Sequence, residues 1–292
     1  MVTTVTVADG RVVAYEQVGD PAGLPVFVLH GTPGSRLGGL QQMSSRVVEA
    51  GLRVISYDRP GYGRSTRHRG RVVVDCVGDV AAIADRLALE RFAVAGGSGG
   101  GAHALAVGRC LPERVTRVLC NVGGAPFDAP DLDWFAGMDP SNVREFGWAL
   151  ESEEILAREL ARESEDVLTR LAEGDPTAIL NDVELASADR AALQDQRLRR
   201  GLTASLREAL REGIWGWVDD DLAFIRPWGF DVEELEVPVE IRYGAGDVLV
   251  PAAHGAWLAA HIPDAIVTVN HGAGHLITPD QYLDQLRALA TA

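Results

Sequence analysis

Residues 93–102 constrain the fold of this chain more than any other segment. A continuous apolar run passes directly into five residues without bulky side chains and then into a stretch with helical apolar spacing. This pattern is typical of a strand that turns sharply into a helix, and small residues let the two segments approach closely. The motif Gly96-x-Ser98-x-Gly100 fits the nucleophile elbow, in which a serine hydroxyl stands above the end of a sheet.

Further apolar runs alternate with helical patterns on both sides of this turn. We expect strands at 25–29, 52–57, 91–95, 115–120, 237–243 and 265–270, and a hairpin of 3–7 with 11–18. Helical spacing occurs at 40–50, 72–89, 102–111, 252–261 and 276–290. Continuous apolar strands separated by helices predict an α/β fold, with a parallel sheet that has helices on both faces.

This alternation stops near residue 125 and resumes near residue 237. Residues 125–235 are mostly helical in pattern and hold 26 acidic residues against 11 arginines, which accounts for the net charge of −15 of the whole chain. We therefore predict an α/β core of residues 1–124 and 236–292 and a helical cap, or lid, of residues 125–235. Such charge is typical of solvated helix faces, and it would also favour a neutral or cationic substrate.

The composition limits the expected partners. The 42 acidic residues outnumber 27 basic residues, all of them arginine, so we expect no binding to nucleic acid or to an anionic membrane. Cys76, Cys110 and Cys120 lack Cys-x-x-Cys spacing, so neither a disulfide framework nor a zinc cluster is expected. No leader or long apolar run is visible, which favours a cytoplasmic protein acting on a small molecule. The oligomeric state stays open.

A glycine-rich turn after a strand can also bind a dinucleotide. Here the Gly-x-Gly-x-x-Gly spacing fails, because Gly97 and Gly99 are followed by Ala102 at the third position. The next strand ends in Asn121, where an acidic residue would be needed. We therefore expect no nucleotide cofactor.

A serine nucleophile needs a base, and the base needs an acid that orients it. Asp247 and His275 each follow a predicted strand, so we expect both at the same edge of the sheet as Ser98. Their order along the chain, Ser98, Asp247 and His275, is that of nucleophile-elbow hydrolases. Rival candidates for the base and the acid are His271, Asp221 and Asp264.

Two loops after other strands are also candidates. The loop that begins at His30 is expected to present the backbone N–H of Thr32 to a developing oxyanion, and the N–H of Gly99 would be the second donor. His30 itself is expected to hold that loop. Asp58 is expected to pair with Arg59 or with backbone N–H groups.

The cap is rich in aromatic residues, which pack between cap and core or line a substrate site. We expect a mostly apolar substrate pocket. Four tryptophans near the two ends of the cap are the candidates for its lining: Trp134, Trp148, Trp215 and Trp217.

Together these motifs resemble the α/β-hydrolase superfamily, in the branch with a serine nucleophile and a helical cap. The matching segments are 30–34, 58–65, 96–100, 244–247 and 274–275. The resemblance implies a mostly parallel eight-stranded sheet with the cap after the sixth strand. It also implies a catalytic triad of Ser98, His275 and Asp247, and an oxyanion hole formed by the N–H groups of Thr32 and Gly99.

Within the superfamily, haloalkane dehalogenases and epoxide hydrolases use an aspartate nucleophile, where this chain has Ser98. Proline iminopeptidases are similar at 30–34, but they usually carry Trp after the nucleophile and Gln-Arg after the loop aspartate, where this chain has Gly99 and Arg59-Pro60.

The residues thus predict a carboxylesterase-like serine hydrolase, without metal or cofactor, that cleaves a small carboxylic ester through an acyl-enzyme. The alternatives are a proline-iminopeptidase-like aminopeptidase, a carbon–carbon bond hydrolase and a non-catalytic ligand-binding protein of the same fold.

Overall fold

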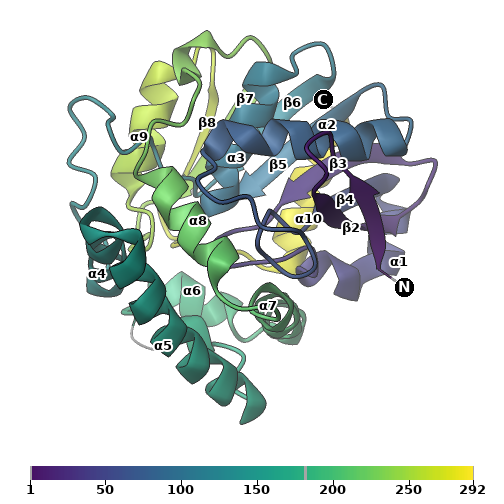
Figure 1. Cartoon of the computed structure of the whole chain (residues 1–292). Helices are drawn as coiled ribbons and strands as arrows, with labels where there is room; N and C mark the ends of the chain where they lie inside the picture. Colours follow the sequence, from purple (N-terminus) through teal and green to yellow (C-terminus); the bar gives the residue numbers. More distant parts are fainter. Residues whose placement is uncertain (1, 181–182, 292) are drawn as a thin grey trace.

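The computed structural model describes residues 2–180 and 183–291, and one eight-stranded sheet forms its centre (Figure 1). The strands lie in the order β1-β2-β4-β3-β5-β6-β7-β8. β1 and β2 run antiparallel to their neighbours, and all other pairs are parallel. The bounds are β1 Thr3–Thr6, β2 Val12–Gly19, β3 Leu24–Leu29, β4 Leu52–Tyr57, β5 Phe92–Gly97, β6 Val115–Asn121, β7 Val239–Gly244 and β8 Ile266–Asn270.

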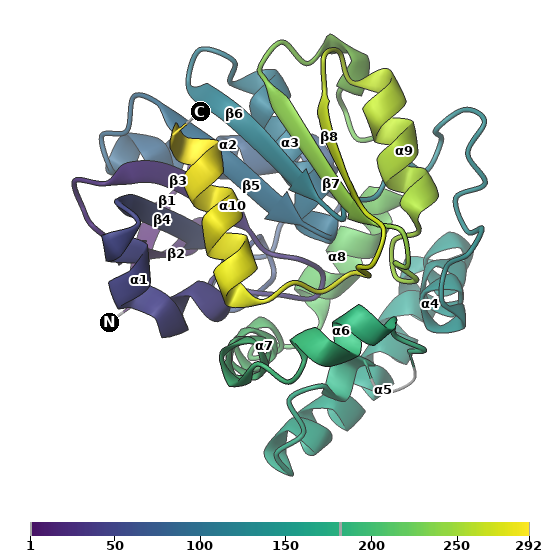
Figure 2. The same ribbon diagram turned by 180° about the vertical axis from the view of Figure 1, so that it is seen from behind.

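Helices cover both faces of this sheet, as the views from opposite sides show (Figures 1 and 2). One apolar cluster packs α2, α3 and α9 on one face, and another packs α1 and α10 on the other. The bounds are α1 Ser44–Glu49, α2 Cys76–Arg86, α3 Gly99–Cys110, α9 Ala252–His261 and α10 Pro279–Thr291, with short 3-10 helices η1 Gly39–Met43 and η2 Val73–Asp75. The predicted α/β fold, with its mostly parallel eight-stranded sheet, is confirmed.

Only helices and loops lie between β6 and β7 in the described residues. They are α4 Pro140–Glu151, α5 Glu153–Ala172, η3 Ala178–Leu180, α6 Ser187–Ala192, α7 Gln196–Ala209, α8 Trp215–Phe224 and η4 Val232–Glu234. Several of these helices share a separate apolar cluster that includes Leu156, Leu160, Leu206 and Trp217. We propose that this helical group is the cap of residues 125–235 and that residues 1–124 and 236–292 form the core.

The long helical stretches of this group are interrupted by N-caps. Ser152 has an extended backbone between α4 and α5, and its hydroxyl accepts a hydrogen bond from the N–H of Ile155 at 3.2 Å. Asp195 caps α7 in the same way by accepting from the N–H of Arg197. Both residue types satisfy N–H groups that a helix start leaves without intrahelical partners. The chain therefore starts a new helix after Ser152 and another after Asp195.

No helix in residues 2–180 and 183–291 combines the length and apolar character that crossing a bilayer requires. Within the same residues, no group of three or more His, Cys, Asp or Glu side chains has an arrangement suited to a metal ion.

Candidate active site

Ser98 lies at the sharp turn between β5 and α3. Its φ of +53° and ψ of −130° are unusual for a residue with a side chain, and they store strain in the turn. The turn is held by hydrogen bonds from the N–H of Ser98 to the carbonyl of Asn121 and from the N–H of Gly101 to the carbonyl of Ser98. A Cβ at Gly96 would lie 2.0 Å from the carbonyl oxygen of Gly100, so this close approach requires glycine.

The loops after β7 and β8 bring Asp247 and His275 into contact. The Nδ1 atom of His275 lies 2.8 Å from Oδ2 of Asp247. The other carboxylate oxygen accepts from the N–H groups of Leu249 and Val250, both at 2.9 Å, so the acid is fixed on two sides. Because a carboxylate can only accept, we assign the proton of the neutral ring to Nδ1, which leaves Nε2 free to act as a base.

Burial and charge oppose each other at His275. Burial disfavours the imidazolium, but the Asp247 carboxylate outweighs it, and the pKa of His275 lies above its usual value. The rival base His271 and the rival acid Asp264 are both exposed. Ser98 and His275 line one cavity, whereas neither of these two rivals does.

That cavity has a volume of about 690 Å³ and lies between the sheet edge and the helices α4, α5, α7 and α8. Trp134 and Trp217 line it. Trp148 and Trp215 do not line it, which corrects their expected role. Trp215 is 40% exposed and lies under the guanidinium of Arg67 at 3.9 Å, because it begins α8 on the side away from the cavity. Trp148 packs against the apolar cluster of the cap.

The loop after β3 reaches the serine. A Cβ at Gly31 would lie 3.4 Å from Cβ of Ser98, and a Cβ at Gly99 would lie 2.4 Å from Oγ1 of Thr32. The structure thus brings Thr32 and Gly99 together beside Ser98. His30 holds the loop as expected, since its Nδ1 lies 2.7 Å from the carbonyl oxygen of Gly31. Burial and the nearby Arg59 lower the pKa of His30 well below its usual value, so its ring is neutral.

Acidic side chains form part of the cavity wall. Glu145 from α4 and Asp221 from α8 both line the cavity, and Nε1 of Trp217 donates to Glu145 at 2.7 Å. Burial raises the pKa of Glu145 to about 7. Burial and the charge of Glu145 also raise the pKa of Asp221 well above its usual value. Asp221 was a rival for the orienting acid, but it lies in this wall, and Asp247 is the acid that contacts His275.

The structure confirms one of the two kinds of partner expected for Asp58, the backbone N–H groups, and corrects the other, Arg59. Its carboxylate pairs with Arg36 at 2.5 Å and accepts from the backbone N–H groups of Arg36 and Arg64. Arg59, the expected partner, pairs instead with Asp220 of α8 at 2.5 Å. Asp220 is 161 positions further along the chain, so no local pattern indicates this pair.

Two histidines outside the proposed triad are fully buried. His103 on α3 and His254 on α9 have exposed fractions of 0% and 1%. Both lie on helices predicted from the spacing of apolar residues at 102–111 and 252–261. His254 holds the aromatic wall of the cavity, because its Nε2 lies 2.9 Å from the carbonyl oxygen of Trp134.

Sequence comparison places the chain among hydrolases. Residues 25–281 match the model of the alpha/beta hydrolase fold family. A proline iminopeptidase of Xylella fastidiosa is 28% identical over an alignment of 302 positions that spans 96% of this chain and 92% of that protein. A pimeloyl-[acyl-carrier protein] methyl ester esterase of Nitrosomonas europaea is 27% identical and covers 82% of this chain and 85% of that protein.

Solved structures resemble the whole chain. An esterase from Exiguobacterium antarcticum superposes with a TM-score of 0.69 at 18% identity and full coverage of both chains. The enol-lactonase of Burkholderia xenovorans gives a TM-score of 0.65 at 20% identity, with 99% and 100% coverage. At these identities the similarity to solved structures supports the fold, and the match to the family model supports the assignment to the hydrolases. The chain belongs to the alpha/beta hydrolase fold family and is an enzyme of the hydrolase class.

Proposed function

We propose that this enzyme is a serine hydrolase that cleaves a small carboxylic ester through an acyl-enzyme. The observation that carries the proposal is the 2.8 Å contact between His275 and a carboxylate that is itself fixed by two N–H groups. An imidazole oriented in this way, in the same cavity as a serine at a strained strand-to-helix turn, is the arrangement that activates a hydroxyl nucleophile.

In the proposed mechanism, the Ser98 hydroxyl oxygen attacks the ester carbonyl carbon while Nε2 of His275 takes its proton. The negative charge that develops on the carbonyl oxygen is bound by the N–H groups of Thr32 and Gly99, and each such donor is typically worth about 3 kcal/mol. His275 then gives the proton to the leaving alcohol. A water molecule, deprotonated by His275, attacks the acyl-enzyme and releases the acid and the free serine.

An ester substrate is favoured by the mainly apolar lining of the cavity, to which Trp134, Phe146, Trp217, Phe224 and Trp228 contribute. Apolar walls with a few convergent polar groups are typical of small-molecule sites. The methyl ester esterase of Nitrosomonas europaea is also among the relatives.

A fluorophosphonate probe and two substrates test the proposal. We expect the probe to label the wild-type chain at Ser98 and to leave the Ser98→Ala variant unlabelled. We also expect p-nitrophenyl esters of short acids to be hydrolysed faster than the matching arylamides. No labelling of the folded wild type would favour a non-catalytic ligand-binding protein instead.

A second candidate function is release of an amino-terminal residue, and the acidic wall of the cavity favours it. Glu145 and Asp221 together hold a titratable charge that would pair with a substrate ammonium group, and proline iminopeptidases are among the relatives. Faster turnover of an amino-acid arylamide than of an ester, with a KM that rises in Glu145→Gln for the arylamide alone, would establish this alternative.

A further inference from the structure

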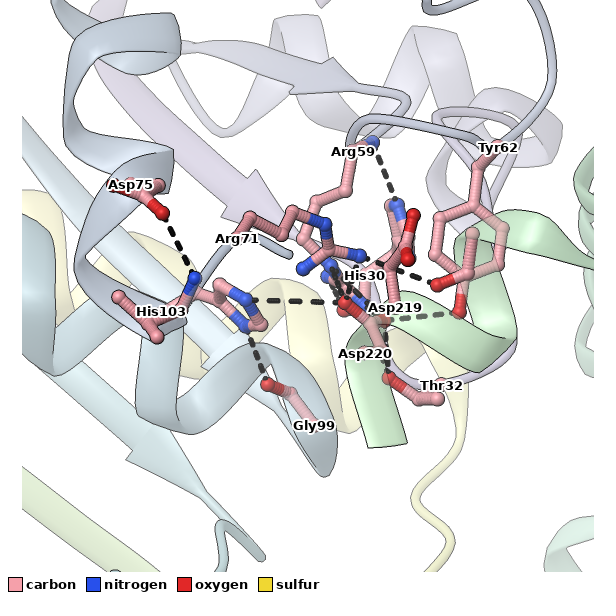
Figure 3. Close-up of polar contacts among 12 residues, drawn as sticks. His30, Thr32, Arg59, Tyr62, Arg71, Asp75, Gly99, His103, Asp219 and Asp220 are labelled. Atoms are coloured by element: carbon pink, nitrogen blue, oxygen red, sulfur yellow. Dashed lines mark hydrogen bonds and ion pairs between the residues drawn. The ribbon is translucent and has the colours of Figure 1, made fainter. Parts of the chain in front are cut away.

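A buried cluster of charges lies directly behind the loop that carries Thr32, and the proposed mechanism does not use it. Figure 3 shows the cluster, in which Asp220 of α8 pairs with Arg59 and Arg71 of the core. We propose that Asp220 and Arg59 are positioning residues that orient and polarise the Gly31–Thr32 peptide, so that α8 of the cap completes the oxyanion hole. This inference rests on the proposed function, in which the Thr32 N–H binds the oxyanion.

The first step is the contact between Arg59 and the peptide. Nη2 of Arg59 donates to the carbonyl oxygen of Gly31 at 2.9 Å and to Oγ1 of Thr32 at 3.0 Å, and Nη1 donates to the carbonyl oxygen of His30. The carbonyl of Gly31 and the N–H of Thr32 belong to one planar peptide group and point in opposite directions. A guanidinium that holds the oxygen on one side therefore fixes the N–H on the other.

The second step is polarisation. A charge-assisted hydrogen bond draws electron density towards the Gly31 oxygen, and this makes the N–H of the same peptide a stronger donor, because linked hydrogen bonds strengthen one another. The effect is greatest where water is excluded, and the Arg59 side chain has an exposed fraction of 0%.

The third step is the role of Asp220, which holds Arg59 in place. The Asp220 carboxylate is fully buried and lies 2.5 Å from Nη2 of Arg59 and 2.6 Å from Nη2 of Arg71. It also accepts from the hydroxyl of Tyr62 at 2.9 Å and from the hydroxyl of Thr32 at 2.6 Å. Thr32 is thus bound through its side chain to both members of the Arg59–Asp220 pair.

Asp220 stays ionised although it is buried. Burial alone would neutralise Asp220, but Arg59 and Arg71 outweigh it and keep the pKa of Asp220 well below its usual value. The neighbouring His103 adds no charge, because burial and Arg59 lower its pKa to about 3. Two guanidinium groups thus share one carboxylate, and the hydrogen bond from Arg59 to the carbonyl oxygen of Gly31 stays charge-assisted.

Two variants test this role on a p-nitrophenyl ester. Asp220→Asn removes the negative charge that holds Arg59 and keeps the side-chain shape, and Thr32→Val removes the hydroxyl but keeps the backbone N–H. We expect kcat to fall about 10- to 100-fold in Asp220→Asn and about 10-fold in Thr32→Val, with KM within about threefold of the wild type. The affinity of a trifluoromethyl ketone, which forms an oxyanion on the enzyme, should fall by the same factor as kcat.

Glu208→Gln is the matched control, because Glu208 of α7 forms a separate buried ion pair between cap and core, with Arg36 at 2.7 Å, and touches neither Gly31 nor Thr32. It should lower the melting temperature without changing kcat or ketone affinity. Unchanged kcat in folded Asp220→Asn, or equal losses of kcat in Asp220→Asn and Glu208→Gln, would overturn the inference. If Asp220→Asn does not fold, Thr32→Val replaces it in this comparison, and an unchanged kcat in that variant would overturn the inference.

Failure of the proposed function has a different signature. In that case the wild type would not be labelled by a fluorophosphonate at Ser98, and the ketone would not bind to it. A labelled and ketone-binding wild type with unaffected variants would contradict the positioning role alone.

Discussion

The carboxylate of Asp189, on α6, accepts a hydrogen bond from the backbone N–H of His275 at 3.1 Å. Its second oxygen accepts from the N–H of Leu276 at 2.7 Å. Asp189 is fully buried, and a Cβ at Gly274 would lie 2.1 Å from it, so the loop fits closely around the carboxylate. Asp189 therefore holds the loop of the proposed base, although Asp189 and His275 are far apart in the sequence.

Replacing Asp189 by Asn should disturb this base. Asp247 makes the larger contribution to the raised pKa of His275, and the charge of Asp189 adds to it. Loss of that charge should lower the pKa of His275, so the acid limb of the kcat/KM profile should move to lower pH. We expect kcat to fall about 10-fold, measured on a p-nitrophenyl ester between pH 5 and 9. An unmoved acid limb would contradict the electrostatic part of this prediction.

Asp247→Asn should leave the fold intact but remove the anion that orients His275. We expect kcat to fall by about 10⁴, as when the orienting acid of a serine triad is replaced, because the ring no longer holds its proton on Nδ1. Circular dichroism would check the fold, and the rate of fluorophosphonate labelling would report the loss of serine reactivity. Labelling at the wild-type rate would show that His275 does not depend on this acid.

Gly96→Ala should destabilise the chain, since the added Cβ would lie 2.0 Å from the carbonyl oxygen of Gly100. We expect the free energy of unfolding to fall by about 3 kcal/mol or more. Gly78→Ala is the matched control. Gly78 is exposed in α2 with nothing within 4 Å of the added Cβ, so it should gain up to about 1 kcal/mol. Urea unfolding of both variants measures the difference, and equal stability would refute the close approach at Gly96.

Glu145 should make stability depend on pH. Its pKa is raised from 4.5 to about 7 in the folded chain, so folding is favoured at low pH and this contribution is lost as the pH rises through about 7. We expect the wild type to lose about 2 kcal/mol more than Glu145→Gln between pH 5 and pH 8. Urea unfolding at both pH values measures this. Parallel losses in the two proteins would place the titration elsewhere.

Replacing Trp217 and replacing Trp215, which are close together in the sequence, should have different effects on KM. Trp217 lines the cavity, so Trp217→Ala should raise KM for an ester with a bulky acyl group by about 10-fold, because apolar contact is lost. Trp215 is 40% exposed and outside the cavity, so Trp215→Ala should change KM by less than about twofold. Steady-state kinetics on one ester series would compare them, and equal effects would contradict the placement of these side chains.

Local sequence determined the sheet and the proposed chemistry at its edge. Apolar runs give buried parallel strands, and the residues that follow them meet at one edge, so Ser98, Asp247 and His275 could be assigned to one site without a structure. The nucleophile elbow could also be recognised from the sequence, because the close contact between Gly96 and Gly100 requires glycine wherever a chain makes this turn.

The docking of the α4–α8 helices on the core was decided only by the tertiary structure. Arg59 pairs with Asp220 and not with its neighbour Asp58, and Asp189 reaches the loop of His275 from α6. Trp217 faces the cavity, whereas Trp215, two residues earlier, does not. Local sequence does not specify these partners, because a buried charge or an aromatic ring takes its environment from whichever distant element packs against it, and that is settled when the whole chain folds.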